Sequence, residues 1–267
     1  MEDYDDDQDA ELPRDPAIDR AIQKLSDFFL ATPRRLFYST QIETTLERDF
    51  FHWITGKALL EMAQTREIHR IPETIQEKTV NFYAHPGHRY WRRELGEIRQ
   101  LLDRIFHPDF THAIGRHGEL MFDAALGRNG FRTEATNTKE WQGRMWTTTN
   151  HNLDRIVTRD GRTYGVEIKN TQNYISRQEL TTKIQLCQYL QVTPLFIMRF
   201  APKSYIHQVN QARGFVLLFE EQMYPLGHSA LLTEVRTKLN LKVNSPRDVK
   251  EGDIQRLLNW HNKQPTP

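Results

Sequence analysis

Apolar residues recur at helical spacing in the first part of the chain. Residues 17–31, 41–47 and 52–64 each place apolar side chains three or four positions apart, which predicts three amphipathic helices. Two short runs with strand-like composition follow, at residues 67–71 and 79–83. This part of the chain therefore predicts three helices followed by a two-stranded ribbon.

The rest of the chain begins with a long amphipathic helix predicted at residues 90–106, after which helix-like and strand-like segments alternate. In chain order these are a helix at 111–126, strands at 131–136, 153–158 and 163–170, a helix at 176–190, a strand at 195–200, a helix at 202–212 and a strand at 215–219. This order predicts an α/β domain with a mixed sheet. We expect two terminal helices, at 231–239 and 253–261, to pack on the edge of that sheet.

An Asp-Gly pair at residues 160–161 is the strongest hairpin signal in the chain, because both residue types tolerate the positive φ angles of a type I′ turn. A two-residue loop there places Asp154 opposite Glu167 on the neighbouring strand. Lys169 leaves the strand on the same face as Glu167, since side chains alternate along a strand. The pattern predicts two carboxylates and one ammonium group on one face of a hairpin.

Facing carboxylates repel each other, so this pair predicts a cation between them. Oxygen donors suit Mg²⁺ or Mn²⁺, and the sequence has no clustered His or Cys set typical of zinc. The alternative is an exposed acid pair neutralised by Lys169 alone.

Composition excludes several classes of protein. Charged residues make up 27% and apolar residues 38% of the chain, and no apolar run is long enough to span a membrane. The acidic start is unlike a signal peptide, and Cys187 is the single cysteine. We therefore expect a cytoplasmic protein with no membrane partner.

Charge is distributed unevenly along the chain. Residues 1–16 carry eight acids against Arg14, so the net charge of +1 leaves the remaining residues with +8. A dense run of like charge with few apolar residues predicts a disordered acidic tail at 1–16. The remainder is mildly basic, which is a weak indication of polyanion binding.

Three helices and a ribbon are the layout of a winged helix-turn-helix, here at residues 17–86. Such a module contacts DNA through its third helix, which makes Lys57 a candidate contact; a protein dimerisation module is the alternative. A connecting segment at 87–110 begins with interleaved cations and aromatics, in which Arg92 and Arg93 are candidate phosphate contacts.

The acidic pair carries a resemblance to a known family. Asp154, followed after twelve residues by Glu167-Ile168-Lys169, resembles the PD-(D/E)xK motif of the restriction-endonuclease-like nucleases, although Leu153 stands where the motif has proline. The predicted elements at 111–200 follow the αβββαβ order of that superfamily. The resemblance assigns residues 111–267, with their C-terminal helices, to a nuclease domain.

Two further positions extend the resemblance. Glu119 lies on the helix before the sheet, where the superfamily often carries another metal-binding glutamate. Gln185 and Tyr189 look like the QxxxY motif of RecBCD-type nucleases, which would position the DNA strand.

The resemblance implies hydrolysis of a phosphodiester bond with the help of Mg²⁺, for which Mn²⁺ would substitute. The implied metal ligands are Glu119, Asp154, Glu167 and the backbone carbonyl of Ile168. Lys169 would orient the attacking water or stabilise charge on the phosphate, and neighbouring carboxylates disfavour it as a general base by raising its pKa.

Together these features predict a metal-dependent DNA endonuclease in defence and restriction, or in recombination and repair. A symmetric DNA target would call for a homodimer. The alternatives are a non-enzymatic DNA-binding regulator built on a nuclease-like scaffold and a nuclease for RNA or transposon ends.

Overall fold

The computed structural model describes residues 14–264 and divides into two units. Among these residues, the first unit comprises 14–111 together with 233–241, and the second comprises 112–232 together with 242–264. Across the described residues, no helix has the length and apolar character needed to cross a bilayer.

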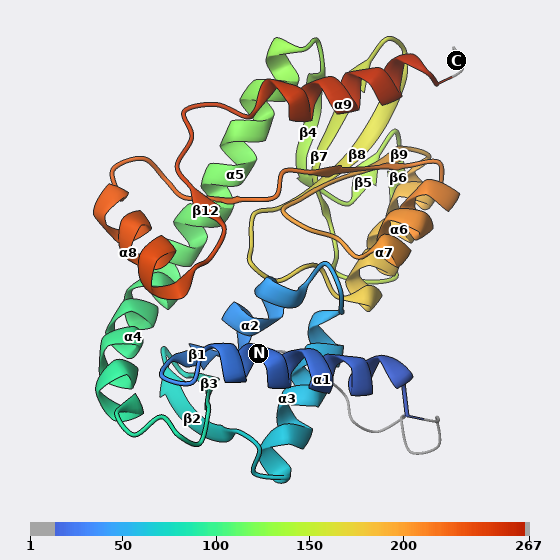
Figure 1. Ribbon diagram of the computed structural model, residues 1–267. Helices are drawn as coiled ribbons and strands as arrows, with labels where there is room; N and C mark the ends of the chain where they lie inside the picture. The colour runs from blue at the N-terminus through green and yellow to red at the C-terminus, as the bar shows by residue number, and fades with distance from the viewer. Residues whose placement is uncertain (1–13, 265–267) are drawn as a thin grey trace. The chain divides into compact units, whose positions relative to one another are not determined.

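The first unit contains the three predicted helices and the ribbon (Figure 1). Its elements in chain order are α1 (Pro16–Ala31), β1 (Leu36–Tyr38), α2 (Ser39–Leu46), α3 (His52–Gln64), β2 (His69–Ile75) and β3 (Lys78–Ala84). β3 is the central strand of a small sheet, with β1 and β2 antiparallel on either side of it. One face of each helix packs into a shared apolar core.

The ribbon is longer than the sequence predicts, since β2 continues through Pro72, which pairs with Asn81. Proline has no N–H to donate, and β2 accommodates it because it is an edge strand.

Asp15 caps the first helix. Its carboxylate accepts a hydrogen bond from the backbone N–H of Ala17 at 2.8 Å, and Pro16 is the first residue of α1. Both are favourable for a helix start. Most of the predicted acidic tail, residues 1–13, lies outside the described residues; the prediction is wrong for its last residues, which belong to the first unit.

The predicted long helix is present as α4 (Trp91–Phe106). Ahead of it, His88 is hydrogen-bonded to Glu94 at 2.8 Å, and Glu94 also accepts from the backbone N–H of Leu36 at 3.0 Å. These bonds tie the start of α4 to β1.

Helix α8 (Ser229–Leu239) corrects one expectation. From residue 233 onward it belongs to the first unit, where Glu234 accepts both hydrogen bonds of Arg104 on α4 at 3.0 Å. The prediction that this helix packs on the edge of the large sheet is wrong for the residues from 233 onward, because they belong to the first unit together with Arg104, the partner of Glu234.

The second unit is built on a five-stranded mixed sheet, which confirms the predicted α/β class. Its elements are α5 (Pro108–Arg128, of which the part from residue 112 belongs to this unit), β4 (Arg132–Thr138), β5 (Glu140–Trp141), β6 (Arg144–Met145), β7 (Leu153–Arg159), β8 (Arg162–Lys169), α6 (Arg177–Leu190), β9 (Thr193–Met198), α7 (Lys203–Gln211), β10 (Phe215–Leu218), β11 (Gln222–Met223), β12 (Val243–Asn244) and α9 (Glu251–Asn262). The strand order is β10-β9-β8-β7-β4; β8, β9 and β10 run parallel, while β7 is antiparallel to both of its neighbours.

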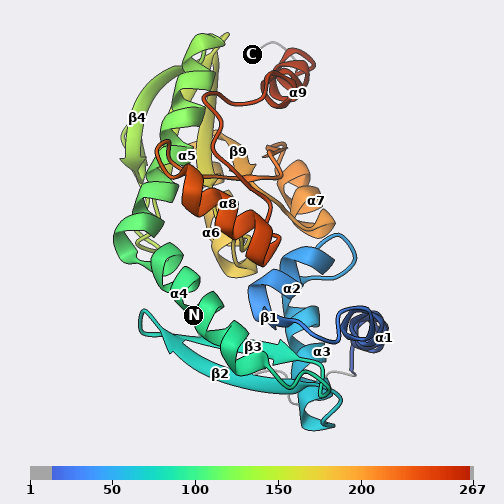
Figure 2. The same cartoon turned by 60° about the vertical axis from the view of Figure 1, so that its left-hand side comes forward.

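Helices cover both faces of this sheet (Figures 1 and 2). Residues of α5 and α9 share one core with one face of β7, β8 and β9, and residues of α6 and α7 pack against the other face. Trp260 of α9 stacks on Phe215 of the edge strand β10 at 5.0 Å between ring centroids. The expectation that the last helix packs at the sheet edge is confirmed.

The β7–β8 hairpin has the predicted turn and register. Asp160 and Gly161 adopt φ angles of 48° and 75°, and Arg159 pairs with Arg162. Extended along the strands, this register brings residues 154 and 167 opposite each other.

Asn170 fastens the segment that follows β8. Its side-chain amide donates to the carbonyls of Ile114 (2.8 Å) and Met223 (2.7 Å), and its oxygen accepts from the N–H of Met223 (2.7 Å). Gly118 of α5 lies so close that an added Cβ would be 2.5 Å from the Cβ of Asn170. The absence of a side chain at Gly118 therefore sets how closely α5 approaches the end of β8.

Gly118→Ala is expected to destabilise the protein by about 1–3 kcal/mol, because the new methyl group overpacks the contact with Asn170. Gly115→Ala is the matched control on the same helix, since its Cβ would meet open space; it is expected to gain up to about 1 kcal/mol from helix propensity. Urea unfolding of both variants measures the difference, and equal stabilities would contradict the close approach.

Candidate active site

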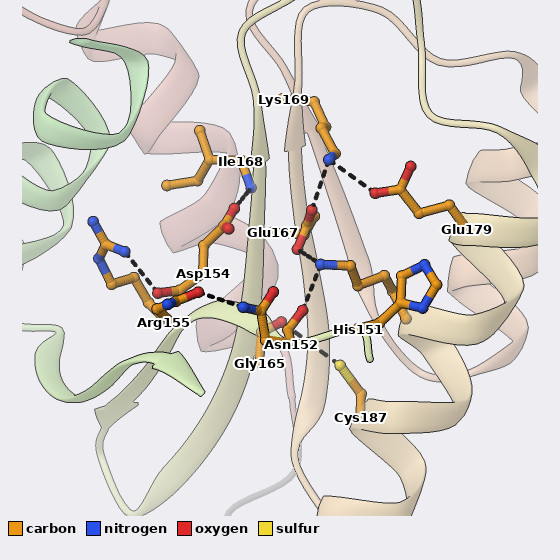
Figure 3. A network of polar contacts seen from close by, with 12 residues as sticks. His151, Asn152, Asp154, Arg155, Gly165, Glu167, Ile168, Lys169, Glu179 and Cys187 are labelled. Carbon is orange, nitrogen blue, oxygen red and sulfur yellow. Dashed lines mark hydrogen bonds and ion pairs between the residues drawn. The ribbon is translucent and has the colours of Figure 1, made fainter. Parts of the chain in front are cut away.

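Glu167 is a buried carboxylate enclosed by two lysines, Lys169 and Lys183; Figure 3 labels Glu167 and Lys169. It is 2% exposed, its Oε2 lies 2.6 Å from Nζ of Lys183, and its Oε1 lies 3.1 Å from Nζ of Lys169. Both oxygens are thus engaged by positive charge.

Close packing of α6 on the sheet brings Lys183 to this position. A Cβ on Gly165 would lie 2.8 Å from Sγ of Cys187, so the missing side chain lets α6 approach β8. Lys183 precedes Cys187 by one helical turn, and Glu167 follows Gly165 on the same face of the strand. The two charged groups therefore meet once the helix has docked.

Lys169 links Glu167 to a second carboxylate on α6. Its Nζ lies 2.9 Å from Oε1 of Glu179, in the first turn of the helix (Figure 3). Ser176 caps this helix, because its hydroxyl accepts a hydrogen bond from the backbone N–H of Glu179 at 3.1 Å. This bond fixes the backbone position of Glu179 in the first helical turn.

Asp154 lies beside the buried carboxylate, as the hairpin register predicts. Its Oδ2 accepts the backbone N–H of Ile168 at 2.7 Å. Burial, and next the negative charge of Asp154, raise the pKa of Glu167, whereas Lys169 and Lys183 lower it; the net direction is upward. In this buried position, the two lysines favour the ionised form of Glu167.

Lys169 is held in its protonated form. Burial lowers its pKa, but the combined charges and hydrogen bonds of Glu167 and Glu179 outweigh burial and raise the pKa above its ordinary value. This agrees with the expectation that neighbouring carboxylates make Lys169 a fixed positive charge and a poor general base.

Glu119 is engaged by an arginine. Its Oε2 lies 3.1 Å from Nη2 of Arg155, which also holds Asp123 at 2.7 Å. Arg155 follows Asp154 on β7 and so projects toward the α5 face, whereas Asp154 and Glu167 belong to the α6 face. The structure joins Glu119 to Arg155, and its predicted metal role would require that carboxylate to leave the arginine.

Gln185 and Tyr189 lie on the exposed side of α6. Tyr189 is 47% exposed and packs edge-on against Trp146 at 5.6 Å. Gln185 follows Lys183 by two residues, so it points to the opposite side of the helix from Glu167. The structure does not bring these two side chains into the carboxylate cluster.

The candidate DNA contacts lie in the first unit. Lys57 on α3 is exposed and lies 5.4 Å from the ring centroid of Trp53, and Arg92 at the start of α4 lies 4.6 Å from that of Trp91. The side chain of Arg93 is 89% exposed, with Glu97 at 3.7 Å. Each cation is at the surface of its own helix.

No family model, curated protein or solved structure matches this chain. The chemistry of the site is therefore argued from its own donors. Asp154, Glu167 and the carbonyl of Ile168 are hard oxygen donors of the kind that Mg²⁺ and Mn²⁺ prefer. Within residues 14–264, however, no three acidic, histidine or cysteine side chains form a metal-binding group. The chemical type of these donor atoms suits Mg²⁺ or Mn²⁺. At Glu167 the ion would compete with the ammonium groups of two lysines.

Sequence reasoning missed Lys183 and Arg155. The pairing of Arg155 is predictable from the sequence pattern. Glu119 and Asp123 lie four residues apart on one helix face, and strand alternation turns Arg155 toward that helix. Lys183 had no comparable signal, since its pairing depends on how closely α6 docks.

Glu167→Gln is expected to lose about 3–5 kcal/mol of stability, because it leaves two lysine ammonium groups without their buried partner. Glu179→Gln is the matched control. Glu179 is partly exposed, and of the two site lysines it pairs only with Lys169. A loss of at most about 1 kcal/mol of stability is therefore expected. Chemical denaturation at pH 7 compares them. A Glu167→Gln protein as stable as the parent would contradict the paired arrangement.

Proposed function

We propose that the chain is a metal-dependent nuclease of restriction-endonuclease-like type that hydrolyses DNA, in defence or in recombination and repair. The observation that carries this proposal is the β7–β8 register, which sets Asp154 beside Glu167 and turns Lys169 to the same face. This is the arrangement that the Asp…Glu-x-Lys spacing implies.

The order of elements supports the same proposal. α5, β4, β7, β8, α6 and β9 follow the αβββαβ order, with a small β5–β6 ribbon inserted before β7. In the first unit, three helices and an antiparallel ribbon support a winged helix-turn-helix that binds DNA.

Each site residue has a chemical role in this proposal. Asp154, Glu167 and the Ile168 carbonyl would hold Mg²⁺, which when bound would polarise the scissile phosphate and lower the pKa of a water molecule. Lys169, kept protonated by Glu167 and Glu179, would stabilise the negative charge that develops on the phosphate.

A second candidate is a DNA-binding regulator in which the nuclease-like unit is a scaffold. It is favoured by the two lysines on Glu167, which balance the buried charge without any added ion. Hydrolysis of DNA in the presence of Mg²⁺ separates the two candidates.

Asp154→Asn and Lys169→Met are expected to reduce Mg²⁺-dependent DNA cleavage on the order of 100-fold or more, because each removes a charge that acts on the phosphate or its ion. Asn can still accept the Ile168 N–H, so the fold is retained. Cleavage is measured on linear, supercoiled, branched and single-stranded DNA, with binding measured in parallel and expected to change little. Asp109→Asn, an exposed acid, is the control; undiminished cleavage in either site variant would overturn the assignment.

Lys57→Ala and Arg92→Ala are each expected to weaken DNA binding for all sequences and to reduce the slope of log K against log salt by about 1, since each removes one phosphate contact. Lys24→Ala on α1, whose ammonium pairs with Asp49, is the control and is expected to leave the slope unchanged.

Sedimentation of the same variants tests the dimerisation alternative. Unchanged DNA affinity combined with a shift from dimer to monomer would favour a dimerisation module over a DNA-binding one.

A further inference from the structure

Lys183 is a buried cation that the proposed chemistry does not use. Its side chain is 5% exposed, and its Nζ has two partners in the described structure: Oε2 of Glu167 at 2.6 Å and the backbone carbonyl of Asn152. Asn152 immediately precedes β7, so Lys183 connects α6 to the ends of both strands that bear the acidic pair.

The two lysines on Glu167 differ in their second partner. Lys169 is shared with the carboxylate of Glu179, whereas Lys183 is shared with a neutral carbonyl. If a divalent ion took over the charge of Glu167, Lys169 would keep an ion pair and Lys183 would keep only a hydrogen bond. Charge repulsion from the ion therefore acts on Lys183 with less to hold it in place.

The net charge of the cluster also indicates that Lys183 is the group that opposes a divalent ion. Asp154, Glu167 and Glu179 supply three carboxylates, and Lys169 and Lys183 two ammonium groups, so one net negative charge remains. A divalent ion added to this set leaves excess positive charge beside the buried pair of Glu167 and Lys183. Without the charge of Lys183 the same ion would be balanced.

We propose that Lys183 is a resident counter-ion of Glu167 that competes with the divalent ion, so that loading the metal requires Nζ of Lys183 to give up Oε2 of Glu167. Lys183 is thus a positioning residue that stabilises the metal-free site and weakens metal binding. This inference rests on the proposed function, because it concerns the same carboxylate.

Lys183→Met keeps the length of the side chain and removes its charge. We expect Mn²⁺, measured by electron paramagnetic resonance or calorimetry on the full chain, to bind on the order of tenfold more tightly than to the parent. The metal-free variant should melt at a lower temperature than the parent and should gain more from added Mn²⁺. If Lys183 had a structural role alone, its substitution would leave the affinity for Mn²⁺ unchanged or would weaken it.

Lys250→Met is the matched control, since Lys250 is exposed and pairs with Glu221, which is not one of the three carboxylates of this cluster; its Mn²⁺ affinity should equal that of the parent. Lys183→Gln, which retains a donor for the Asn152 carbonyl, is a second variant in case methionine prevents folding and should also bind more tightly. Unchanged or weaker Mn²⁺ binding in a folded variant overturns the proposal.

If neither variant folds, nuclear magnetic resonance of the lysine side chains decides the question in the parent. Addition of Mg²⁺ should change the signal of Lys183 as it leaves Glu167, and an unchanged signal at saturating Mg²⁺ overturns the proposal. These results distinguish the two proposals. Tighter Mn²⁺ binding by the Lys183 variant without DNA cleavage by the parent would refute only the nuclease proposal. DNA cleavage with unchanged Mn²⁺ affinity of the variant would refute only the counter-ion role of Lys183.

Discussion

The burial of one carboxylate, Glu167, is the constraint on which the second unit depends. An ionised carboxylate inside a protein loses several kcal/mol of hydration and is tolerated when charged partners replace the water. Here one partner, Lys169, comes from the same strand, while the other, Lys183, comes from a helix that follows the hairpin in the chain. Docking of α6 and burial of the charge are therefore a single event: the small Gly165 admits the helix, and the helix delivers the cation.

The two faces of the β7–β8 hairpin each carry an ionic cluster, and they do different things. On the α5 face, Arg155 joins Asp123 and Glu119 of the helix to the strand, which holds α5 in register with β7. On the α6 face, Asp154 bonds the backbone of β8 and leaves its charge beside Glu167. Because strand residues alternate, neighbouring positions can serve structure and chemistry separately. Anchoring on both faces holds the candidate site on rigid elements, which is what a site with strict geometry requires.

What the sequence predicts well is local. The Asp-Gly turn, with both residues at positive φ, is enough to set the hairpin register, and strand alternation then places Asp154, Glu167 and Lys169 on one face. What it misses depends on distant partners. The part of α8 from residue 233 onward belongs to the first unit, where Glu234 pairs with Arg104, and no local pattern reveals such a contact. Pro72 argues against a continuous β2 until the strand is known to lie at an edge.

The second lysine was also beyond prediction, and it changes what the acidic pair implies. Two carboxylates that face each other require positive charge nearby, but that requirement does not specify an ion. In this fold the protein supplies the charge itself, so the acid pair alone is weaker support for a metal than its spacing suggests. The stronger support lies in the inequality of the lysines: one is doubly anchored by carboxylates and the other is not. In the proposed nuclease this inequality would have a use, because Lys183 would have to leave Glu167 when the ion binds while Lys169 stayed in place to face the phosphate.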